Sequence, residues 1–276
     1  MRKIFVVLLV FYISSLNGQT KVNLFPGKLN IQPFTANLLE PKLGSQFDMN
    51  NNELRLNIGN SLDLININSS SNNIWSIGAD LFTFTLLRSE TAFHFPVDAV
   101  DFLFGLNMGY KKVCGNGDEY GLRARISHIS AHLADGHYDG NNNVWRNGHN
   151  PRVYSREFVE LLPFYRFSGM RIYGGVTYIF HIDPVNLGKT NFQAGFDYFP
   201  EVTLLENIHP FVGYDIKLTD ISKYKANNSI MAGIKFGYAT GRGISLYYNY
   251  YSGNNFHGEY FDRPNEYSAI GFNLDL

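Results

Sequence analysis

Three residue types that together can activate a hydroxyl nucleophile lie near the middle of the chain. His128 and Ser130 are two positions apart, and Glu157 follows after the polar segment 134–152. A serine hydroxyl becomes a strong nucleophile when an imidazole takes its proton, and the imidazole needs an acceptor that holds its tautomer. The sequence therefore suggests His128 as base, Ser130 as nucleophile and Glu157 as the orienting group. The alternative is that these polar side chains simply face lipid headgroups and water, because His-x-Ser by itself is a common tripeptide.

The segments that carry these residues have the period-two pattern of β-strands. Between 120 and 132 the even positions are apolar up to Ile126 and continue with His128 and Ser130, whereas the odd positions begin with arginines. Between 153 and 168 the odd positions are apolar from Val159 onward and also include Glu157. Arginines belong in a barrel lumen, so we expect the candidate residues on the lipid-facing side of two neighbouring strands.

The register of these two strands can be estimated from the loop between them. If the strands pair across positions 133 and 152, His128 lies opposite Glu157 and Ser130 lies opposite Ser155. Opposite residues have Cβ atoms roughly 4.5–5.5 Å apart. Strand residues from Phe167 back to Glu157, at ~3.3 Å each and a tilt of ~40°, cover about 25 Å, the height of an apolar band. We therefore expect the three residues at the outer-leaflet interface.

The whole chain beyond residue 40 repeats this alternation. The pattern predicts about twelve strands, near 42–49, 53–67, 73–88, 100–113, 118–133, 153–168, 169–182, 190–203, 207–220, 228–240, 241–252 and 265–276. One face of each strand is apolar, and the other is rich in Gly, Asn, Arg and Asp. Alternation alone is also compatible with a soluble sandwich, whose apolar face points inward.

The lengths of the connections distinguish these two folds. Tight turns at 168–169, 206–207 and 240–243 alternate with longer polar stretches at 134–152, 183–189, 219–227 and 252–264. Short turns on one side and long loops on the other are typical of outer-membrane barrels, and an even number of strands places both termini in the periplasm. We therefore predict an all-β fold, a closed antiparallel transmembrane β-barrel over residues 41–276.

The N-terminus indicates export. Arg2 and Lys3 precede the apolar run 4–13, and the small residue Gly18 comes before Gln19. This layout predicts a signal peptide over residues 1–18, and the run is too short for a membrane-spanning helix. Residues 19–40 are expected to form an extended periplasmic lead-in. Together with the barrel pattern, export predicts a location in the bacterial outer membrane.

Composition narrows the partners and cofactors. Charged residues make up 17% of the chain, below the roughly 25% of soluble domains. The net charge of −1 argues against nucleic acid as a partner, and one cysteine excludes an intramolecular disulfide. We expect outer-membrane lipids as partners and no cofactor. Calcium is a weak possibility at Asp135, Asp139 and the run 141–143, which lack the spacing of a known calcium loop.

Two further segments carry residues that could form a site. His181-Ile-Asp183 ends a strand and is interpreted as part of a loop, and Gly241-Arg-Gly is interpreted as a turn because no helix follows it. The last strand alternates Ile270, Phe272, Leu274 and Leu276 outward to the final residue. Such a strand resembles the signal read by the barrel-assembly machinery, which is therefore an expected partner during insertion.

Several segments resemble a bacterial family known as domain of unknown function 1207. They are 128–135, 155–157, 173–181 and 247–276. The resemblance implies an outer-membrane protein and brings no established activity. Separately, His128, Ser130 and Glu157 resemble the outward-facing sites of lipid A deacylase, which uses His, Ser and Glu. They are also similar to the site of outer-membrane phospholipase A, a twelve-stranded barrel with Asn as the third member.

Two function classes remain open from the sequence. The first is a lipid acyl-ester hydrolase that acts on the outer leaflet, of the phospholipase or lipid A deacylase type. The second is a non-enzymatic barrel, either a small channel or an envelope-structure protein.

Overall fold

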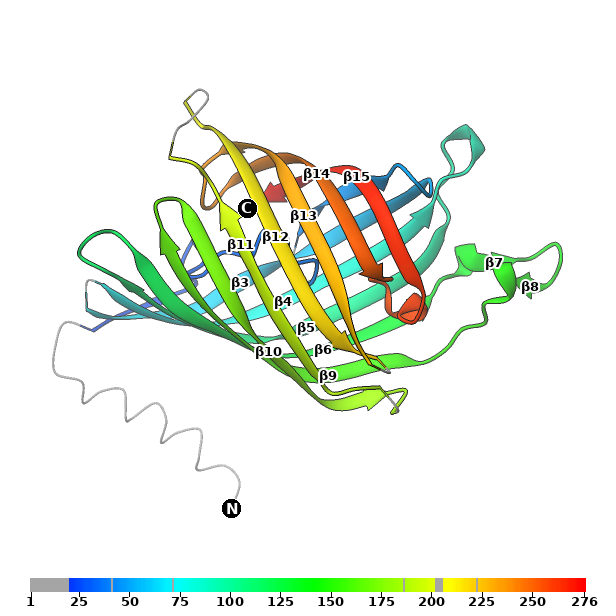
Figure 1. Ribbon diagram of the computed structural model, residues 1–276, viewed down its shortest axis with the longest axis horizontal. Helices are drawn as coiled ribbons and strands as arrows, with labels where there is room; N and C mark the ends of the chain where they lie inside the picture. Colours follow the sequence, from blue (N-terminus) through cyan, green and yellow to red (C-terminus); the bar gives the residue numbers. More distant parts are fainter. Residues whose placement is uncertain (1–19, 41, 71, 186, 202–205, 222) are drawn as a thin grey trace, which may run out of the picture.

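The chain forms a closed antiparallel β-barrel of twelve strands in a computed structural model (Figure 1). The structure describes residues 20–40, 42–70, 72–185, 187–201, 206–221 and 223–276. The predicted signal peptide therefore lies outside the described residues. The strands are β2 (Leu43–Asp48), β3 (Glu53–Ser70), β4 (Asn73–Arg88), β5 (Val97–Val113), β6 (Glu119–Leu133), β9 (Tyr154–Phe167), β10 (Met170–Asp183), β11 (Thr190–Tyr198), β12 (Ile208–Asp220), β13 (Tyr224–Gly237), β14 (Gly243–Asn254) and β15 (Pro264–Asp275).

Each strand pairs with its neighbour in the chain, and β2 closes the ring by pairing with both β3 and β15. The shorter elements are β1 (Lys21–Leu24), which pairs with the end of β3, a small hairpin, and single turns of 3₁₀-helix. The hairpin consists of β7 (Tyr138–Asp139) and β8 (Val144–Trp145). The 3₁₀ turns are η2 (Thr91–Phe93), η3 (Asp135–His137), η4 (Arg146–Gly148) and η5 (Gly258–Tyr260). In the described part of the chain, no helix has both the length and the apolar character to cross a bilayer.

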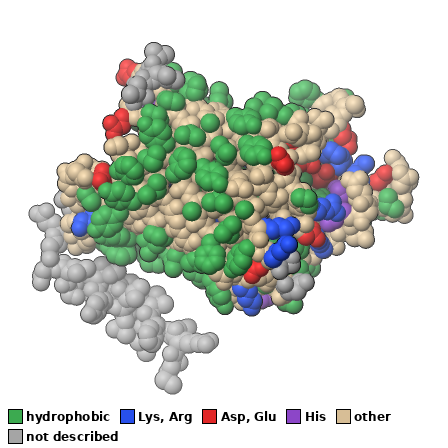
Figure 2. Space-filling view, in the orientation of Figure 1, with side chains coloured by type: hydrophobic (Ala, Val, Ile, Leu, Met, Phe, Trp, Pro, Cys, Tyr) green, Lys and Arg blue, Asp and Glu red, His purple; other side chains and the backbone are tan. Residues whose placement is uncertain are grey.

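The apolar face of the strands points outward, as predicted. Along β5 the outward side chains of Phe102, Phe104, Leu106 and Met108 are 43–56% exposed, whereas Leu103 between them is fully buried. The space-filling view shows such apolar side chains over the wall of the barrel, with charged side chains gathered mainly toward one end (Figure 2). A wall this apolar is unfavourable in water and favourable in lipid. The soluble-sandwich alternative is therefore excluded.

The two ends of the barrel differ. The loop end carries connections 134–153 and 255–263, and the turn end carries β1 and the end of β15 (Figure 1). Two connections differ from the sequence prediction. β13 begins at Tyr224 because the ladder with β12 continues past the polar Asn227, whose side chain bonds the Lys217 carbonyl and the Thr219 hydroxyl. β11 ends at Tyr198, shortly before Pro200, which has no N–H to continue the ladder.

The segment expected as a periplasmic lead-in lies largely inside the barrel. After β1, residues 29–42 (of which 41 is not described) fill the middle of the lumen, and we call them the plug. Phe34 and Glu40 are completely buried, and Phe34 lies between the guanidinium groups of Arg123 and Arg171. Arg123 Nη1 donates to Glu40 Oε2 at 2.7 Å. The plug folds inward because these lumen charges bond its carboxylate and its backbone carbonyls, as Arg171 does at Gln32 and Pro33.

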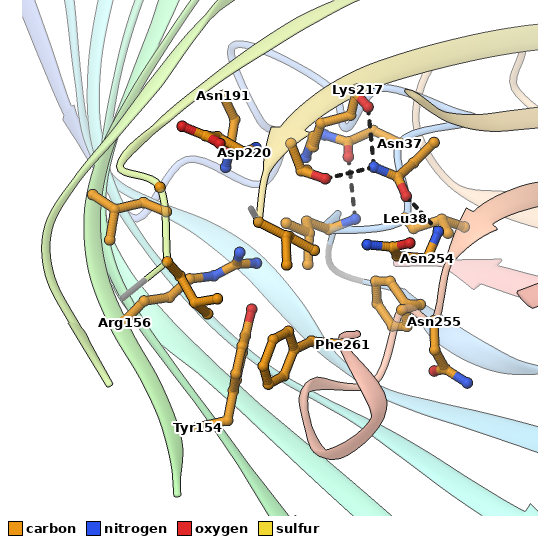
Figure 3. A pocket seen from close by; sticks show the side chains of 18 of the residues that line it. Asn37, Leu38, Tyr154, Arg156, Asn191, Lys217, Asp220, Asn254, Asn255 and Phe261 are labelled. Carbon is orange, nitrogen blue, oxygen red and sulfur yellow. Dashed lines mark hydrogen bonds between the residues drawn. The ribbon is translucent and has the colours of Figure 1, made fainter. Parts of the chain in front are cut away.

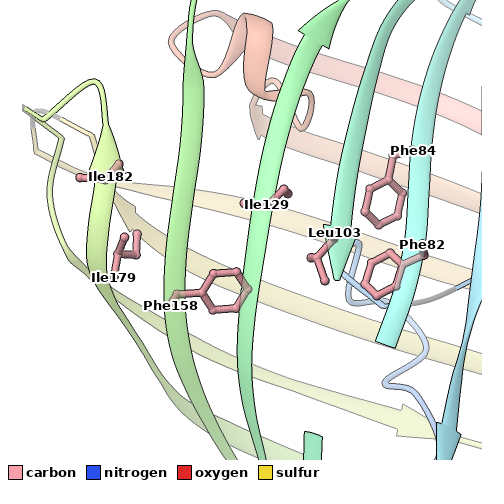
Figure 4. Packing of buried hydrophobic residues seen from close by; sticks show 7 residues of the cluster. All are labelled: Phe82, Phe84, Leu103, Ile129, Phe158, Ile179 and Ile182. Atoms are coloured by element: carbon pink, nitrogen blue, oxygen red, sulfur yellow. The ribbon is translucent and has the colours of Figure 1, made fainter. Parts of the chain in front are cut away.

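An apolar cluster fills the lumen side of the wall that carries the candidate site (Figure 4). It contains inward side chains from five consecutive barrel strands, β4, β5, β6, β9 and β10, each at most 4% exposed. Ile129 and Phe158 belong to it, and they are the chain neighbours of His128 and Glu157. The candidate residues therefore stand on a wall that is rigidly packed from behind. The members are Phe82, Phe84, Leu103, Ile129, Phe158, Ile179 and Ile182.

Candidate active site

The register of β6 and β9 is the one predicted from the loop length. His128 pairs with Glu157 and Ser130 pairs with Ser155. The inward neighbours Ile129 and Phe158 are buried, so the candidate side chains point out of the barrel. All three candidate residues therefore lie on the outer face of two adjacent strands, at nearly the same height on the wall.

His128 and Glu157 are in direct contact. His128 Nδ1 lies 2.6 Å from Glu157 Oε1, and the two side chains are 26% and 30% exposed. The ring of His128 also packs against Phe104 of β5, with ring centroids 4.9 Å apart. With Nδ1 on the carboxylate, the imidazole is held in a defined orientation and its Nε2 is the nitrogen left to exchange a proton.

A second histidine, His181, contacts the other oxygen of Glu157. His181 Nδ1 lies 2.5 Å from Glu157 Oε2, and its side chain is 67% exposed. It reaches this position because β10 has a register shift between Ile179 and His181, which leaves both Phe180 and His181 on the outer face. From the sequence, His181 is expected in a loop, whereas in the structure it belongs to β10. Strict alternation would direct residue 181 inward, and the β-bulge that reverses its direction has no signal in the sequence.

Ser130 lies on the same face, but its hydroxyl contacts a different histidine. Ser130 Oγ is 3.3 Å from Nε2 of His132, two residues further along β6. No hydrogen bond joins it to His128 within the described structure. Ser130 thus lies between His128 and His132 on the same face of β6. Of these two histidines, only His128 contacts a carboxylate of the described residues, that of Glu157, through its Nδ1.

Aromatic side chains surround this group. Phe102 pairs across the strands with Ser130, and Phe104 pairs with His128. On the other side, Tyr178 and Phe180 of β10 point outward and are 53% and 46% exposed. Aromatic girdles of this kind lie at the interfaces of outer-membrane barrels. The hydroxyl, the imidazoles and the carboxylate therefore lie on the outer wall among exposed aromatic side chains.

The residues considered for calcium are engaged otherwise. Asp139 accepts hydrogen bonds from the backbone N–H of Asn141 and Asn142 and from the Asn142 side chain, which lower the pKa of its carboxyl. Among the described residues, no group of three His, Cys, Asp or Glu side chains has the arrangement of a metal site. Asp139 therefore stabilises a turn.

Comparison with known proteins supports the fold. A family model described as "Protein of unknown function (DUF1207)" matches residues 62–275. No curated protein matches the sequence. Among solved structures, outer membrane phospholipase A from Escherichia coli superposes with a TM-score of 0.54 at 12% identity, over 90% of this chain and 95% of that chain. The β domain of the Bordetella autotransporter BrkA gives 0.41 at 15% identity, over 84% and 96%. The likeness to the phospholipase shows a shared barrel fold.

Proposed function

Because the chain belongs to the DUF1207 family, whose description assigns no activity, we propose its function from the geometry: an outer-membrane hydrolase of lipid acyl esters. In this proposal the barrel lies in the bacterial outer membrane with the loop end outside. The apolar outer wall, the aromatic side chains around the site and the outer-membrane-type fold support this placement. The superposed protein is named a phospholipase, which agrees with the proposed substrate class.

The proposed reaction is acyl transfer to serine followed by hydrolysis. Ser130 Oγ attacks the ester carbonyl carbon while His128 Nε2 takes the hydroxyl proton. The carbon–oxygen bond to the alcohol breaks, and the alcohol leaves with that proton. Water then hydrolyses the acyl-serine with the same histidine as base. Glu157 holds the imidazole and stabilises the positive charge that it gains in each step.

The pairing of Ser130 with His132 is the resting arrangement in this proposal. A serine side chain changes its partner by one rotation about χ1, and His128 and His132 are its two neighbours on the strand face. His128 is the better base because Glu157 stabilises its charged form, and His132 has no carboxylate partner among the described residues. We therefore assign the base to His128 and expect His132→Gln to retain activity.

The observation that carries the proposal is the contact of Glu157 with His128 on the lipid-facing side, next to Ser130. The test is fatty-acid release from phospholipid vesicles and from lipopolysaccharide by the purified, detergent-solubilised protein. Ser130→Ala should abolish release and leave heat-modifiable mobility on gels intact. Ser155→Ala is the matched control, since Ser155 pairs with Ser130 on the same face and should be dispensable. Wild-type activity in Ser130→Ala, or equal loss in Ser155→Ala, contradicts the proposal.

The non-enzymatic alternative of a small channel has less support. The plug fills the middle of the lumen, and its Glu40 and Phe34 are held by buried arginines. A channel would require this segment to leave the barrel.

A further inference from the structure

A cavity of about 100 Å³ lies in the loop-end half of the lumen, on the opposite side of the wall from the candidate active site. Leu38 and Leu39 of the plug form part of its lining, and Phe256 and Phe261 enter from connection 255–263 (Figure 3). The volume is several times what one water molecule requires. The cavity therefore has room for part of a small organic ligand.

Two basic side chains line this cavity without an ion-pair or hydrogen-bond partner among the described residues, although the Arg156 guanidinium lies over the rings of Tyr154 and Phe158 at 5.7 and 5.9 Å. Arg156 of β9 and Lys217 of β12 make no ion pair and no side-chain hydrogen bond with any described residue. The Nε of Arg156 is buried and unpaired. A cation withdrawn from bulk water without a partner is unfavourable, so these two groups are suited to an anion supplied from outside.

This lack of partners is particular to the cavity. Every other inward-facing lysine or arginine on the described barrel strands has either an ion pair within 4 Å or a hydrogen bond to an oxygen of the protein. They are Arg55, Arg88, Lys111, Arg123, Arg125, Arg166, Arg171, Lys225 and Lys235. The protein thus neutralises the cations of its lumen elsewhere and leaves two of them exposed to one cavity.

Two acidic residues also line the cavity, and neither is within ion-pair distance of these cations. Asp215 Oδ2 accepts hydrogen bonds from the Tyr173 hydroxyl at 2.7 Å and from Gln193 Nε2 at 2.5 Å. Asp220 packs against the connection after β10, where a Cβ on Gly188 would lie 2.0 Å from its carboxylate carbon. Asp215 is therefore held by two donors at one of its oxygens, and Asp220 is held against the chain at the cavity edge.

The rest of the lining is largely apolar. Ile179 and Ile182 belong to the buried cluster of Figure 4, and Leu39 packs against it. Phe261 stacks on Tyr154, with ring centroids 5.1 Å apart. We propose that this cavity binds a small amphiphilic organic anion, whose carboxylate or phosphate lies against Arg156 and Lys217 and whose apolar part lies against these side chains. This site is separate from the proposed active site.

Calorimetric titration of the full-length mature protein in a nonionic detergent tests the proposal. The probes are hexanoate, hexyl phosphate, hexanol and inorganic phosphate. At least one of the two organic anions should bind. Hexanol lacks the anionic group and inorganic phosphate lacks the apolar chain, so each should bind at least about tenfold more weakly. The stronger of the organic anions identifies the head group. If neither organic anion binds, or if hexanol or inorganic phosphate binds equally well, the proposal is overturned.

Variants distinguish this site from a structural role of the two cations. Arg156→Gln and Lys217→Gln should each weaken binding of the organic anion by about tenfold or more, since each removes a charge-assisted hydrogen bond. Lys217→Arg keeps the charge and should retain binding. Lys189→Gln, which changes an exposed lysine at the same end of the barrel, is the matched control. An unpartnered cation does not stabilise the fold, so Lys217→Gln should not lower the unfolding temperature. Unchanged binding in both glutamine variants, or unfolding of Lys217→Gln, overturns the proposal.

Discussion

Replacing Glu157 by glutamine tests the proposed catalytic chemistry most directly. The amide keeps the size of the side chain and can still accept a hydrogen bond from His128 Nδ1, which lies 2.6 Å from Oε1 in the wild type. The variant removes only the negative charge that faces the imidazole. If His128 gains a proton in the transition state, the loss appears in kcat rather than in substrate binding.

The expected loss follows from the geometry of the pair. Charges about 4 Å apart interact by about 1 kcal/mol at the dielectric constant of water and by about 4 kcal/mol at an effective value near 20. Glu157 and His128 are 30% and 26% exposed, so solvent screens much of this attraction. We take about 1–2 kcal/mol, which corresponds to a roughly five- to thirtyfold loss in kcat for Glu157→Gln.

The assay is acyl release from phospholipid in mixed micelles at saturating substrate. His128→Asn should lose about a hundredfold or more because it removes the base itself. His181→Asn is the matched control: it removes the contact at 2.5 Å to Oε2 and leaves the His128 contact intact, so its loss should be smaller than that of Glu157→Gln. Wild-type kcat in Glu157→Gln, or a larger loss in His181→Asn than in His128→Asn, refutes the reasoning.

Two further predictions concern the plug and the loop end. Glu40→Gln should destabilise the barrel by about 3 kcal/mol, because the buried Arg123 loses its nearest carboxylate and keeps only the longer contact with Glu160 at 3.4 Å. Glu201→Gln at an exposed turn should not destabilise it. The heat-modification midpoint on gels measures this, and equal midpoints contradict it. Burial, together with the nearby Arg263, lowers the pKa of His149 from its ordinary 6.5. The folded connection 134–153 therefore favours neutral His149. Protonation of His149 destabilises this connection as the pH falls below 6.5. Proteolytic cleavage within 134–152 should increase between pH 7 and about pH 5, and His149→Phe should remove part of this dependence.

Much of the fold could be predicted because strand faces follow directly from the order of residues. Successive side chains of a strand point to opposite sides, so the arginines of β6 identified its inner face and placed His128 on the outer one. The loop between β6 and β9 then gave the pairing of His128 with Glu157. Strand ends were less predictable where side chains extended a ladder, as Asn227 does at β13.

The sequence by itself determined the closed barrel, its outward apolar face and the pairing of the candidate residues across two strands, because strand period and the length of the connecting loop are read directly from the order of residues. Only the tertiary structure decided three other features. The bulge in β10 brings His181 to Glu157, since the register shift in the pairing of β10 with β9 breaks the alternation there, and no residue type in the segment indicates it. The rotamer of Ser130 directs its hydroxyl to His132. The plug lies in the lumen because arginines from distant strands converge on Phe34 and Glu40, a contact that no local pattern encodes.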